Sequence, residues 1–446
     1  MNDLKSDLKA IYKSALKAAD PYSSVLAKVR LKNNHLEIGE RSYSLEKYKT
    51  VHVVGAGKAS AEMGRAIVRI LGGRLQKGLI VVRDLPRQDV PLMKILQAGH
   101  PEPDNRGLIA SQSLIHYLQS NVSKHDLLLV LLSGGASALL PSPVEKISLD
   151  DKKATTKILL SCGATIYEIN TIRKHLSRLK GGRFLDYVGG ATVITLIISD
   201  VVGNDLSTIA SGPTCHDPST FSDCFEVLDR YQIRDQIPKS VLSFLRDSAR
   251  GKIDVDTLKV GSPALEKTFN YLVSTNQASL QAAAKKAGSL GYKPMIISSS
   301  IQGNTSDLAS FYVSIAREIL ETGHPLPAPC CLLSGGETTV KVVGDGRGGR
   351  NQEFALSCFH QTQNWKNQSV VFAAIGSDGS DGPTDAAGAI VSNDSRPRAK
   401  KLGLDASDYL RRNDSYTFFQ KLDDLIRTGP TGTNVMDFHF ALIGTD

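Results

Sequence analysis

The chain has 446 residues, too many for a single hydrophobic core, so we expect two or three domains. Its 41% hydrophobic and 22% charged residues are typical of a soluble globular protein, and no apolar stretch is long enough to span a membrane. The net charge of +8 is scattered along a chain with 6% aromatic residues, which argues against a nucleic-acid platform and fits an anionic small substrate.

Neither the N-terminus nor the cysteines indicate export or metal binding. Residues 1–20 are amphipathic rather than uniformly apolar, so we expect a cytoplasmic protein. The six cysteines contain no CxxC pair and the ten histidines no HExxH motif, which favours reduced thiols over a zinc site or a disulfide framework.

Short apolar runs alternate with amphipathic segments along the whole chain, as in βα units built around largely parallel sheets. The predicted strands cover residues 51–54, 79–82, 127–132, 193–198, 271–274, 295–297, 331–333 and 370–375. Most end in Gly, Ser or Asp, and ligands of open α/β sheets bind at these carboxyl ends. A polar stretch over residues 245–268 is the predicted domain junction.

The first predicted strand leads into a glycine turn that contains a lysine, in the segment HVVGAGKASAEMG (residues 52–64). A dinucleotide fingerprint requires a third glycine where Ser60 stands, so an NAD site is weakly supported. A P-loop requires four residues between two glycines, followed by Lys-Ser or Lys-Thr, and this segment lacks that pattern.

Two strand ends carry the same Ser-Gly-Gly sequence, in LLSGGASALL (131–140) and LLSGGETTV (332–340). Backbone N–H groups and hydroxyls at such an end suit phosphate or carboxylate oxygens. A tight turn alone would explain one copy. Two copies followed by hydroxyls, at Ser137 and at Thr338 and Thr339, favour binding.

The segment INTIRKHLSRLKGGR (169–183) predicts a helix with an apolar face and a cationic face, although the charged face could simply be solvated. The next strand delivers Ser199, Asp200, Asn204 and Asp205 to one loop. These carboxylates could hold Mg²⁺ beside a nucleotide, or could cap the following helix.

A second acidic loop, GSDGSDGPTDAAG (376–388), follows a strand and contains Asp378, Asp381 and Asp385. It lacks the glutamate of a calcium loop at the twelfth position, and loop acids facing a substrate fit better. Upstream, Arg347 and Arg350 lie near the start of a predicted helix, where an arginine can bind carboxylate or phosphate with two hydrogen bonds.

Taken together, these motifs resemble the class II glycerate kinases, the glycerate 2-kinase family with a C-terminal MOFRL domain. The resemblance spans nearly the whole chain, in order, through VVGAGKAS, GHPEPD, LLSGGASALL, INTIRKHLSRLKGGR, ISDVVGND, SGPT, LLSGGETTV, GRGGRNQE, GSDGSDGPTDAAGA and TGPTGTNV. It implies ATP-dependent phosphorylation of D-glycerate at the 2-hydroxyl, giving 2-phosphoglycerate, with Mg²⁺ or a similar ion. It also implies a Rossmann-like nucleotide-binding domain over residues 1–255, a mixed-sheet MOFRL-type domain over residues 256–446, and an interdomain cleft.

The same resemblance assigns site residues. The family's essential lysine matches Lys58 and its essential arginine matches Arg350, which we expect to act in catalysis. We expect nucleotide contacts from Gly55, Gly57, Ser133, Gly134, Gly135, Ser137 and Asn204, substrate contacts from Arg173, Ser334 and Glu337, and metal ligands in Asp200, Asp205 and Asp378. The partners would be D-glycerate and a nucleotide, with no nucleic acid or membrane, in a monomer or homodimer. Ala136 stands where the family often has a third glycine, so the backbone would approach phosphate less closely there.

Two other functions compete with this one. A hydroxypyruvate reductase would need nicotinamide binding, for which Lys58 and the missing third glycine are poorly suited. A non-catalytic sugar-phosphate-binding protein could use the same serine-glycine turns, but it would have little need for two acidic loops.

Overall fold

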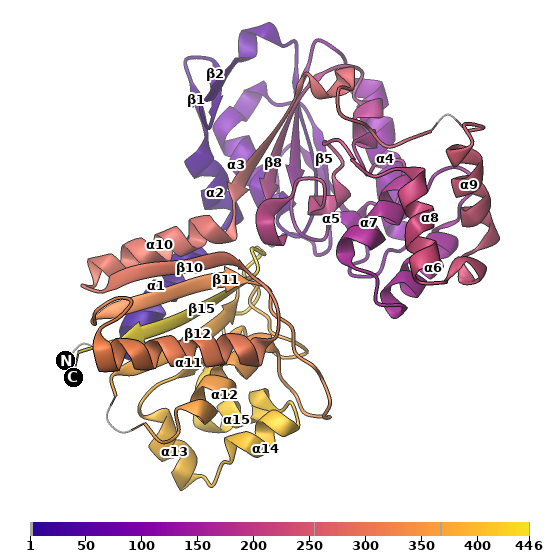
Figure 1. Ribbon diagram of the computed structural model, residues 1–446. Helices are drawn as coiled ribbons and strands as arrows, with labels where there is room; N and C mark the ends of the chain where they lie inside the picture. Colours follow the sequence, from indigo (N-terminus) through magenta and orange to yellow (C-terminus); the bar gives the residue numbers. More distant parts are fainter. Residues whose placement is uncertain (1–2, 254, 366–367, 446) are drawn as a thin grey trace. The chain divides into compact units, whose positions relative to one another are not determined.

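The computed structural model describes residues 3–253, 255–365 and 368–445, which form two compact α/β units (Figure 1). The N-unit comprises residues 24–199 and 204–273. The C-unit comprises the chain up to residue 23, residues 200–203 and the chain from residue 274. The predicted α/β class is therefore confirmed, with one central sheet in each unit.

The N-unit is built on a six-stranded sheet in the order β6-β5-β4-β7-β8-β9, in which β4 to β8 pair in parallel. Its strands are β4 (Val51–Ala56), β5 (Gly78–Val82), β6 (Met93–Gln97), β7 (Leu127–Leu132), β8 (Thr192–Ile198) and β9 (Thr268–Ser274). The apolar runs of β4, β5 and β7 are buried throughout, as in parallel sheets covered on both faces. Ala56 pairs with Leu132, so the turns that follow β4 and β7 lie side by side.

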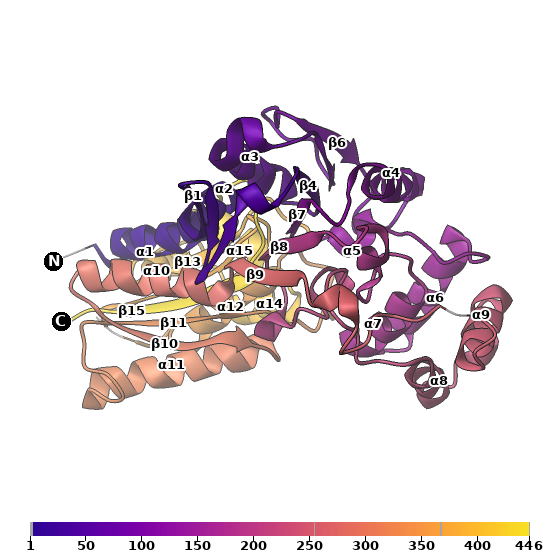
Figure 2. The same cartoon turned by 90° about the horizontal axis from the view of Figure 1, so that it is seen from above.

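Helices surround this sheet and form a separate cluster at one end of the N-unit. The helix α3 (Ser60–Leu71) packs on β4, β5 and β7, and α4 (Asn105–Asn121) packs on β5 and β6. The cluster has its own apolar core and consists of α6 (Leu149–Ser161), α7 (Ile166–His175), α8 (Phe221–Arg230) and α9 (Lys239–Ala249) (Figures 1 and 2). The remaining elements are α2 (Pro21–Lys28), the short helix α5 (Ala136–Leu139), and an antiparallel sheet of β1 (Val29–Lys32), β2 (His35–Ile38) and β3 (Arg41–Ser44).

The predicted helix over residues 169–183 is wrong in its extent. α7 ends at His175, because the chain turns so that Arg178 N–H donates to the Ser142 carbonyl. The alternative of a solvated polar face does not hold for three of its residues: Asn170, Lys174 and Ser177 are buried against the rest of the N-unit.

The C-unit contains a mixed six-stranded sheet in the order β10-β11-β15-β12-β13-β14, with β10 and β11 parallel and the other pairs antiparallel. Its strands are β10 (Lys293–Ile301), β11 (Cys330–Gly336), β12 (Val370–Gly376), β13 (Gly388–Val391), β14 (Leu425–Ile426) and β15 (Asp437–Ile443). The last strand in sequence, β15, lies in the middle between β11 and β12. This position brings Asp437 beside Gly336 and Gly376.

Two helical layers enclose the C-unit sheet. One face is covered by α1 (Leu4–Ala18) and α10 (Asn276–Ser289), and the other by α11 (Thr305–Thr322) and α12 (Arg350–Gln361) (Figures 1 and 2). Beyond α12 lie α13 (Ser395–Lys401), α14 (Ala406–Arg411) and α15 (Ser415–Leu422).

The compact units divide the chain differently from the predicted boundary between residues 255 and 256. The N-unit extends to Val273 because β9 completes its sheet beside β8. The polar stretch over residues 245–268 therefore leads from α9 to β9 inside one unit, and α1 belongs to the C-unit because its buried face packs on α10.

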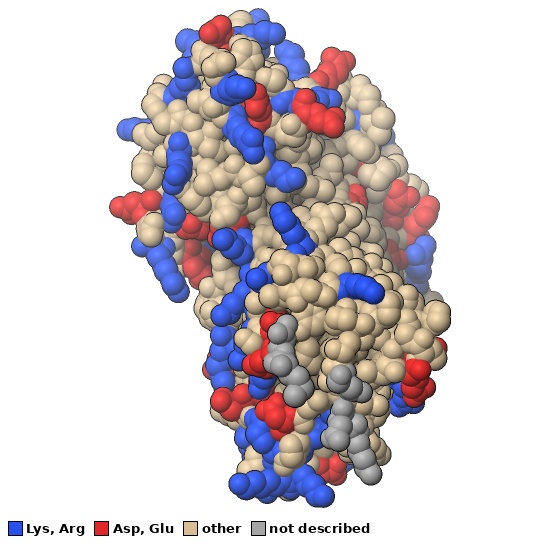
Figure 3. Space-filling model, turned by 90° about the vertical axis from the view of Figure 1, so that its left-hand side faces the viewer, with Lys and Arg blue, Asp and Glu red and all other residues tan. Residues whose placement is uncertain are grey.

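The surface charge is mixed on the face shown in Figure 3, where basic and acidic side chains are interspersed among uncharged residues. Among the described residues, no helix is both long and apolar enough to cross a membrane. All six cysteines are free thiols.

Candidate functional site

The turn that contains Lys58 is fixed against the turn that follows β7. The Lys58 N–H donates to the Gly134 carbonyl at 2.9 Å, and the Ala59 N–H donates to Ser133 Oγ at 3.0 Å. Gly57 has φ +134°, and a Cβ there would lie 2.2 Å from Ser133 Oγ. Glycine is therefore required for the two turns to meet, and the Lys58 side chain starts from a rigid backbone at the carboxyl edge of the sheet.

His100 lies beside Lys58 in this corner. A Cβ on Gly135 would come within 2.9 Å of the His100 ring, so glycine at this position leaves room for the imidazole. Burial and the charges of Lys58 and Arg83 lower the pKa of His100 to about 4. The imidazole is thus neutral at pH 7 and adds no positive charge beside Lys58.

Ser137 and Arg173 form a second group of predicted site residues in the N-unit. Arg173 Nη2 donates to Ser137 Oγ at 2.7 Å, and Ser137 Oγ also lies 2.9 Å from Ser211 Oγ. α7 supplies the arginine and α5 the serine. The predicted nucleotide contact Ser137 and the predicted substrate contact Arg173 therefore belong to one cluster.

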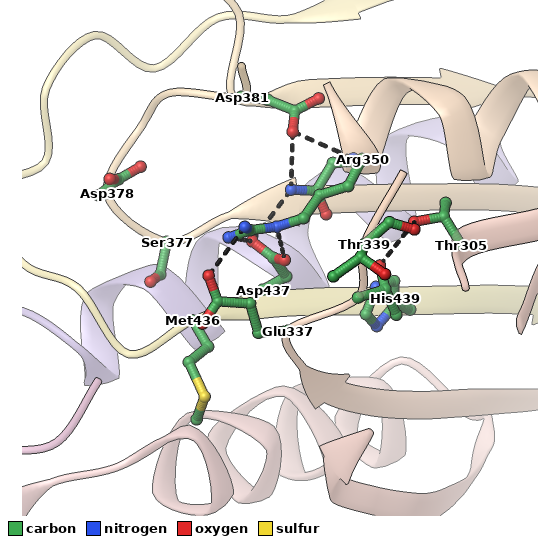
Figure 4. Close-up of polar contacts among 12 residues, drawn as sticks. Thr305, Glu337, Thr339, Arg350, Ser377, Asp378, Asp381, Met436, Asp437 and His439 are labelled. Atoms are coloured by element: carbon green, nitrogen blue, oxygen red, sulfur yellow. Dashed lines mark hydrogen bonds and ion pairs between the residues drawn. The ribbon is translucent and has the colours of Figure 1, made fainter. Parts of the chain in front are cut away.

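In the C-unit, two carboxylates hold Arg350 at the first position of α12 (Figure 4). Nη2 donates to Asp437 Oδ1 at 3.2 Å, Nε donates to Asp437 Oδ2, and Nη1 donates to Glu337 Oε1 at 2.8 Å. The Asp437 side chain is 1% exposed, the Glu337 side chain 47% and the Arg350 side chain 35%. The buried acid therefore orients the guanidinium, while Glu337 forms a partly solvated pair at its outer edge.

The electrostatics of this cluster are set by burial. Burial raises the pKa of Asp437 to about 7, opposed by Arg350 and by the Asn351 amide, which donates to Asp437 Oδ1 at 3.0 Å. Burial acts to lower the pKa of Arg350, but Asp437 and Glu337 outweigh it and raise that pKa above its usual value. The arginine is thus a permanent cation beside a cavity of about 590 Å³ lined by Thr338, Thr339, Ser377 and Asp378.

Comparisons with known proteins cover both units. The model of a domain of unknown function, DUF4147, matches residues 7–246, and the MOFRL family model matches residues 330–437. A glycerate 2-kinase of Pyrococcus horikoshii is 39% identical over 96% of this chain and 95% of its own length. A D-glycerate 2-kinase of Thermotoga maritima is 38% identical over 88% of this chain and 90% of its own length. The chain belongs to the glycerate kinase family that carries a MOFRL domain.

Solved structures agree with this membership. A crystal structure of a Pyrococcus horikoshii protein superposes with a TM-score of 0.88, at 38% identity, over 100% of both chains. A glycerate kinase structure from Thermotoga maritima gives 0.86, at 35% identity, over 99% of this chain and 100% of its own. An Agrobacterium vitis protein provisionally named a hydroxypyruvate reductase is 39% identical over 98% of this chain and 94% of its own length. By family, the protein is a kinase.

The other predicted site residues of this glycerate kinase family member are dispersed. Ser334 lies inside β11, fully buried, and its hydroxyl accepts a hydrogen bond of 2.7 Å from the Tyr312 hydroxyl in the core. The second Ser-Gly-Gly copy therefore forms the last three residues of β11, whereas the first copy follows the end of β7. Gly335 serves packing there, since a Cβ would lie 1.9 Å from Asn276 Oδ1. Asn204 has φ +57°, and its buried Oδ1 has no hydrogen-bond partner among the described residues.

The predicted metal ligands do not build a cation site on their own. Asp205 accepts hydrogen bonds from the Ser207 N–H, the Ser207 hydroxyl and the Thr208 hydroxyl, which cap a turn. Asp378 accepts two from Ser380, and Asp200 groups with the C-unit. In the described chain, no three His, Cys, Asp or Glu side chains are placed to hold a metal ion.

Sequence reasoning missed Asp437 and the separate roles of the acidic loop. Asp381 is buried and accepts hydrogen bonds from the Asn351 and Gln352 N–H groups, so it caps α12 behind Arg350. Asp385 instead pairs with Arg427 at the surface. The alternation in DFHFALI (437–443) was a signal for a strand that begins at Asp437.

Proposed function

We propose that the protein transfers the terminal phosphoryl group of ATP to the 2-hydroxyl of D-glycerate, giving 2-phosphoglycerate and ADP. Similarity to glycerate 2-kinases over both units supports the substrate and the product. The observation that carries the proposal is the placement of Arg350. The buried Asp437 orients its guanidinium, and the outer edge of the guanidinium remains accessible to an anion. An arginine held in this way suits recognition of a carboxylate or phosphoryl group.

In this mechanism Lys58 neutralises the transferred phosphoryl group. The glycerate 2-oxygen bonds to the γ-phosphorus, the bond from that phosphorus to the bridging oxygen breaks, ADP leaves, and the hydroxyl releases its proton. Phosphoryl transfer requires mainly positioning and positive charge around the equatorial oxygens. The backbone bonds of the Lys58 turn to Gly134 and Ser133 support such positioning.

Arg350 and Glu337 act on glycerate together. The guanidinium binds the substrate carboxylate or the phosphoryl oxygens, and Glu337 accepts a hydrogen bond from a glycerate hydroxyl. Their mutual pair is partly solvated, so an incoming anion can replace Glu337 at little cost. The Asp437 contact is buried and keeps the guanidinium in place.

The nucleotide brings its own divalent ion. Mg²⁺ keeps several waters and is commonly bound by substrate phosphates with only one or two carboxylates. Because Asp205 and Asp378 accept hydrogen bonds from hydroxyl and N–H donors, no step of the mechanism runs through a protein-bound metal. The six free thiols fit a reducing compartment such as the cytoplasm.

A coupled assay tests the reaction. The purified protein is mixed with D-glycerate, ATP and Mg²⁺, and enolase converts 2-phosphoglycerate to phosphoenolpyruvate, which is followed by absorbance. Signal with enolase alone is the expected result. Signal only after addition of phosphoglycerate mutase would mean transfer to the 3-hydroxyl. Oxidation of NADH or NADPH by hydroxypyruvate, without ADP release, would favour the reductase.

The Lys58→Ala variant tests the catalytic lysine. Loss of one charge aimed at the transition state is expected to lower kcat by about 10²-fold or more. Lys124→Ala, at an exposed lysine of the same unit, is the matched control and is expected to retain full turnover. Unchanged turnover in Lys58→Ala would remove this role.

A further inference from the structure

One pocket of the N-unit, between α6, α7 and the chain around Ser137, is lined by five basic side chains: Lys152, Lys153, Lys157, Arg173 and Lys180. Lys152 is 6% exposed, and its Nζ has no hydrogen-bond partner among the described residues. Lys180 is 2% exposed and donates to the Ser137 carbonyl at 2.7 Å, and Arg173 donates to Ser137 Oγ. Among the described residues that line the pocket, Glu102 is the one acid, and it is paired with Lys153 at 2.6 Å.

Such a cluster is unfavourable without an anion. A buried ammonium without a partner is costly, and neighbouring like charges add to the cost. Burial and the charges of Arg173 and Arg183 lower the pKa of Lys152 to about 7. Burial and the charges of Lys152 and Arg173 lower the pKa of Lys180. A ligand with several negative charges would relieve this repulsion and give Lys152 the partner that it lacks.

The other wall of the pocket is apolar. Leu149, Leu160, Ile166 and Ile169 line it, and Leu160 and Ile166 are 64% and 52% exposed. The cavity is about 590 Å³, within the range of about 300–1,000 Å³ typical of small-molecule sites. A small hydroxy acid would leave that wall uncovered, whereas a nucleotide carries both a planar apolar base and a chain of phosphates.

Ser137, which lines the pocket, is close in sequence to the turn after β7 that holds the Lys58 turn in place. Ser137 lies three residues after Gly134, whose carbonyl accepts a hydrogen bond from the Lys58 N–H. A phosphate chain that enters over Lys152 and Arg173 would therefore extend toward the cation that we assign to phosphoryl transfer.

We propose that this pocket binds the nucleotide substrate, with the phosphate chain on Lys152, Arg173 and Lys180 and the base against Leu160 and Ile166. The assignment rests on the proposed kinase function and adds a location for its nucleotide. It also accounts for a buried lysine that the fold itself leaves without a hydrogen-bond partner in the described chain.

Calorimetric titration of the full-length protein with ATP, without glycerate, tests the proposal. Lys152→Met keeps the length of the side chain and removes its charge, and we expect at least a tenfold rise in the Kd for ATP. Inorganic triphosphate should lose affinity to a similar extent, whereas adenosine should not. Lys285→Met, at an exposed lysine of α10, is the control and should bind as the wild type does.

Steady-state kinetics separate the alternatives. We expect a raised KM for ATP and an unchanged KM for glycerate in Lys152→Met, in a protein no less stable than the wild type. An unchanged Kd for ATP, or an effect confined to the KM for glycerate, would overturn the assignment. If the variant fails to fold, Arg173→Lys, which loses the contact with Ser137, provides the same test. If the wild type shows no kinase activity but binds ATP, and this binding is lost in Lys152→Met, the proposed function is refuted and the pocket assignment stands.

Discussion

Lys152 should make the stability of the free protein depend on pH. Its pKa falls from 10.5 to about 7 on folding, so below pH 7 both the folded and the unfolded chain carry the charge and folding bears its full burial cost. As the pH rises from 7 toward 10.5, the folded chain releases the proton first and the cost disappears. Lys152→Met should therefore stabilise the protein more at pH 6 than at pH 9, by about 3 kcal/mol.

Urea unfolding at the two pH values measures this difference. Lys153→Met on the same helix is the matched control, because Lys153 is partly exposed and paired with Glu102. A stability gain independent of pH would mean that Lys152 is neutral, or solvated, throughout this range.

Among single residues, the catalytic candidates could be predicted from the sequence, but the residues that hold them in place could not. Lys58 and Arg350 stand in short motifs, GAGK and GGRNQE, that can be matched directly. Asp437 is 87 residues away from Arg350 and has no motif that links the two, so their ion pair depends on the pairing of β11 with β15. Ser334 shows the converse. It stands in the repeated Ser-Gly-Gly sequence, but its hydroxyl faces the core of the C-unit.

At the level of elements, α12 depends on one acid from another loop. Asp381 accepts both backbone N–H groups of Asn351 and Gln352 and both of their side-chain amides. Asp381→Ala would leave these buried donors without a partner, at an expected cost of about 2 to 4 kcal/mol in the free energy of unfolding. Because Arg350 begins the same helix, kcat should fall as well.

Denaturant unfolding and the coupled assay measure both effects. Asp385→Ala removes an exposed acid from the same loop and should change little, since that residue pairs with Arg427 at the surface. Equal effects of the two substitutions would show that α12 does not depend on Asp381.

The pattern of burial of an element decides whether it can be predicted from the sequence. The strands β7 and β12 are continuous apolar runs and β4 and β8 are mostly apolar, and this composition locates them from sequence. β1, β2 and β3 are four-residue strands with charged positions, and β14 has two residues, so pairing rather than composition defines them. α7 ends before its helical pattern does because contacts with residues 142 and 143 redirect the chain.

At the scale of the whole molecule, the first helix, α1, belongs to the C-unit and packs against its sheet. α1 packs on α10 through its buried residues Leu8, Ile11, Tyr12 and Ala15, and Lys5 pairs with Asp424 at 2.7 Å. No local sequence pattern reveals which unit α1 belongs to. An amphipathic pattern shows that a helix has an apolar face, but it does not show which sheet that face packs against. A boundary drawn from composition therefore assigned α1 to the unit that follows it in sequence.

Ile11→Ala in the full-length chain tests the division into units. Ile11 is fully buried, and its truncation should cost about 2 to 5 kcal/mol, borne by the C-unit. In hydrogen exchange, amides of α10, β11 and β15 should lose protection, whereas those of β4 and β7 should keep it, because the N-unit has its own sheet and core. Lys9→Ala, on the exposed face of the same helix, should leave both sets unchanged. Loss of protection in β4 and β7 to the same extent would mean that the two units unfold as one, and that the chain has a single cooperative core despite its two central sheets.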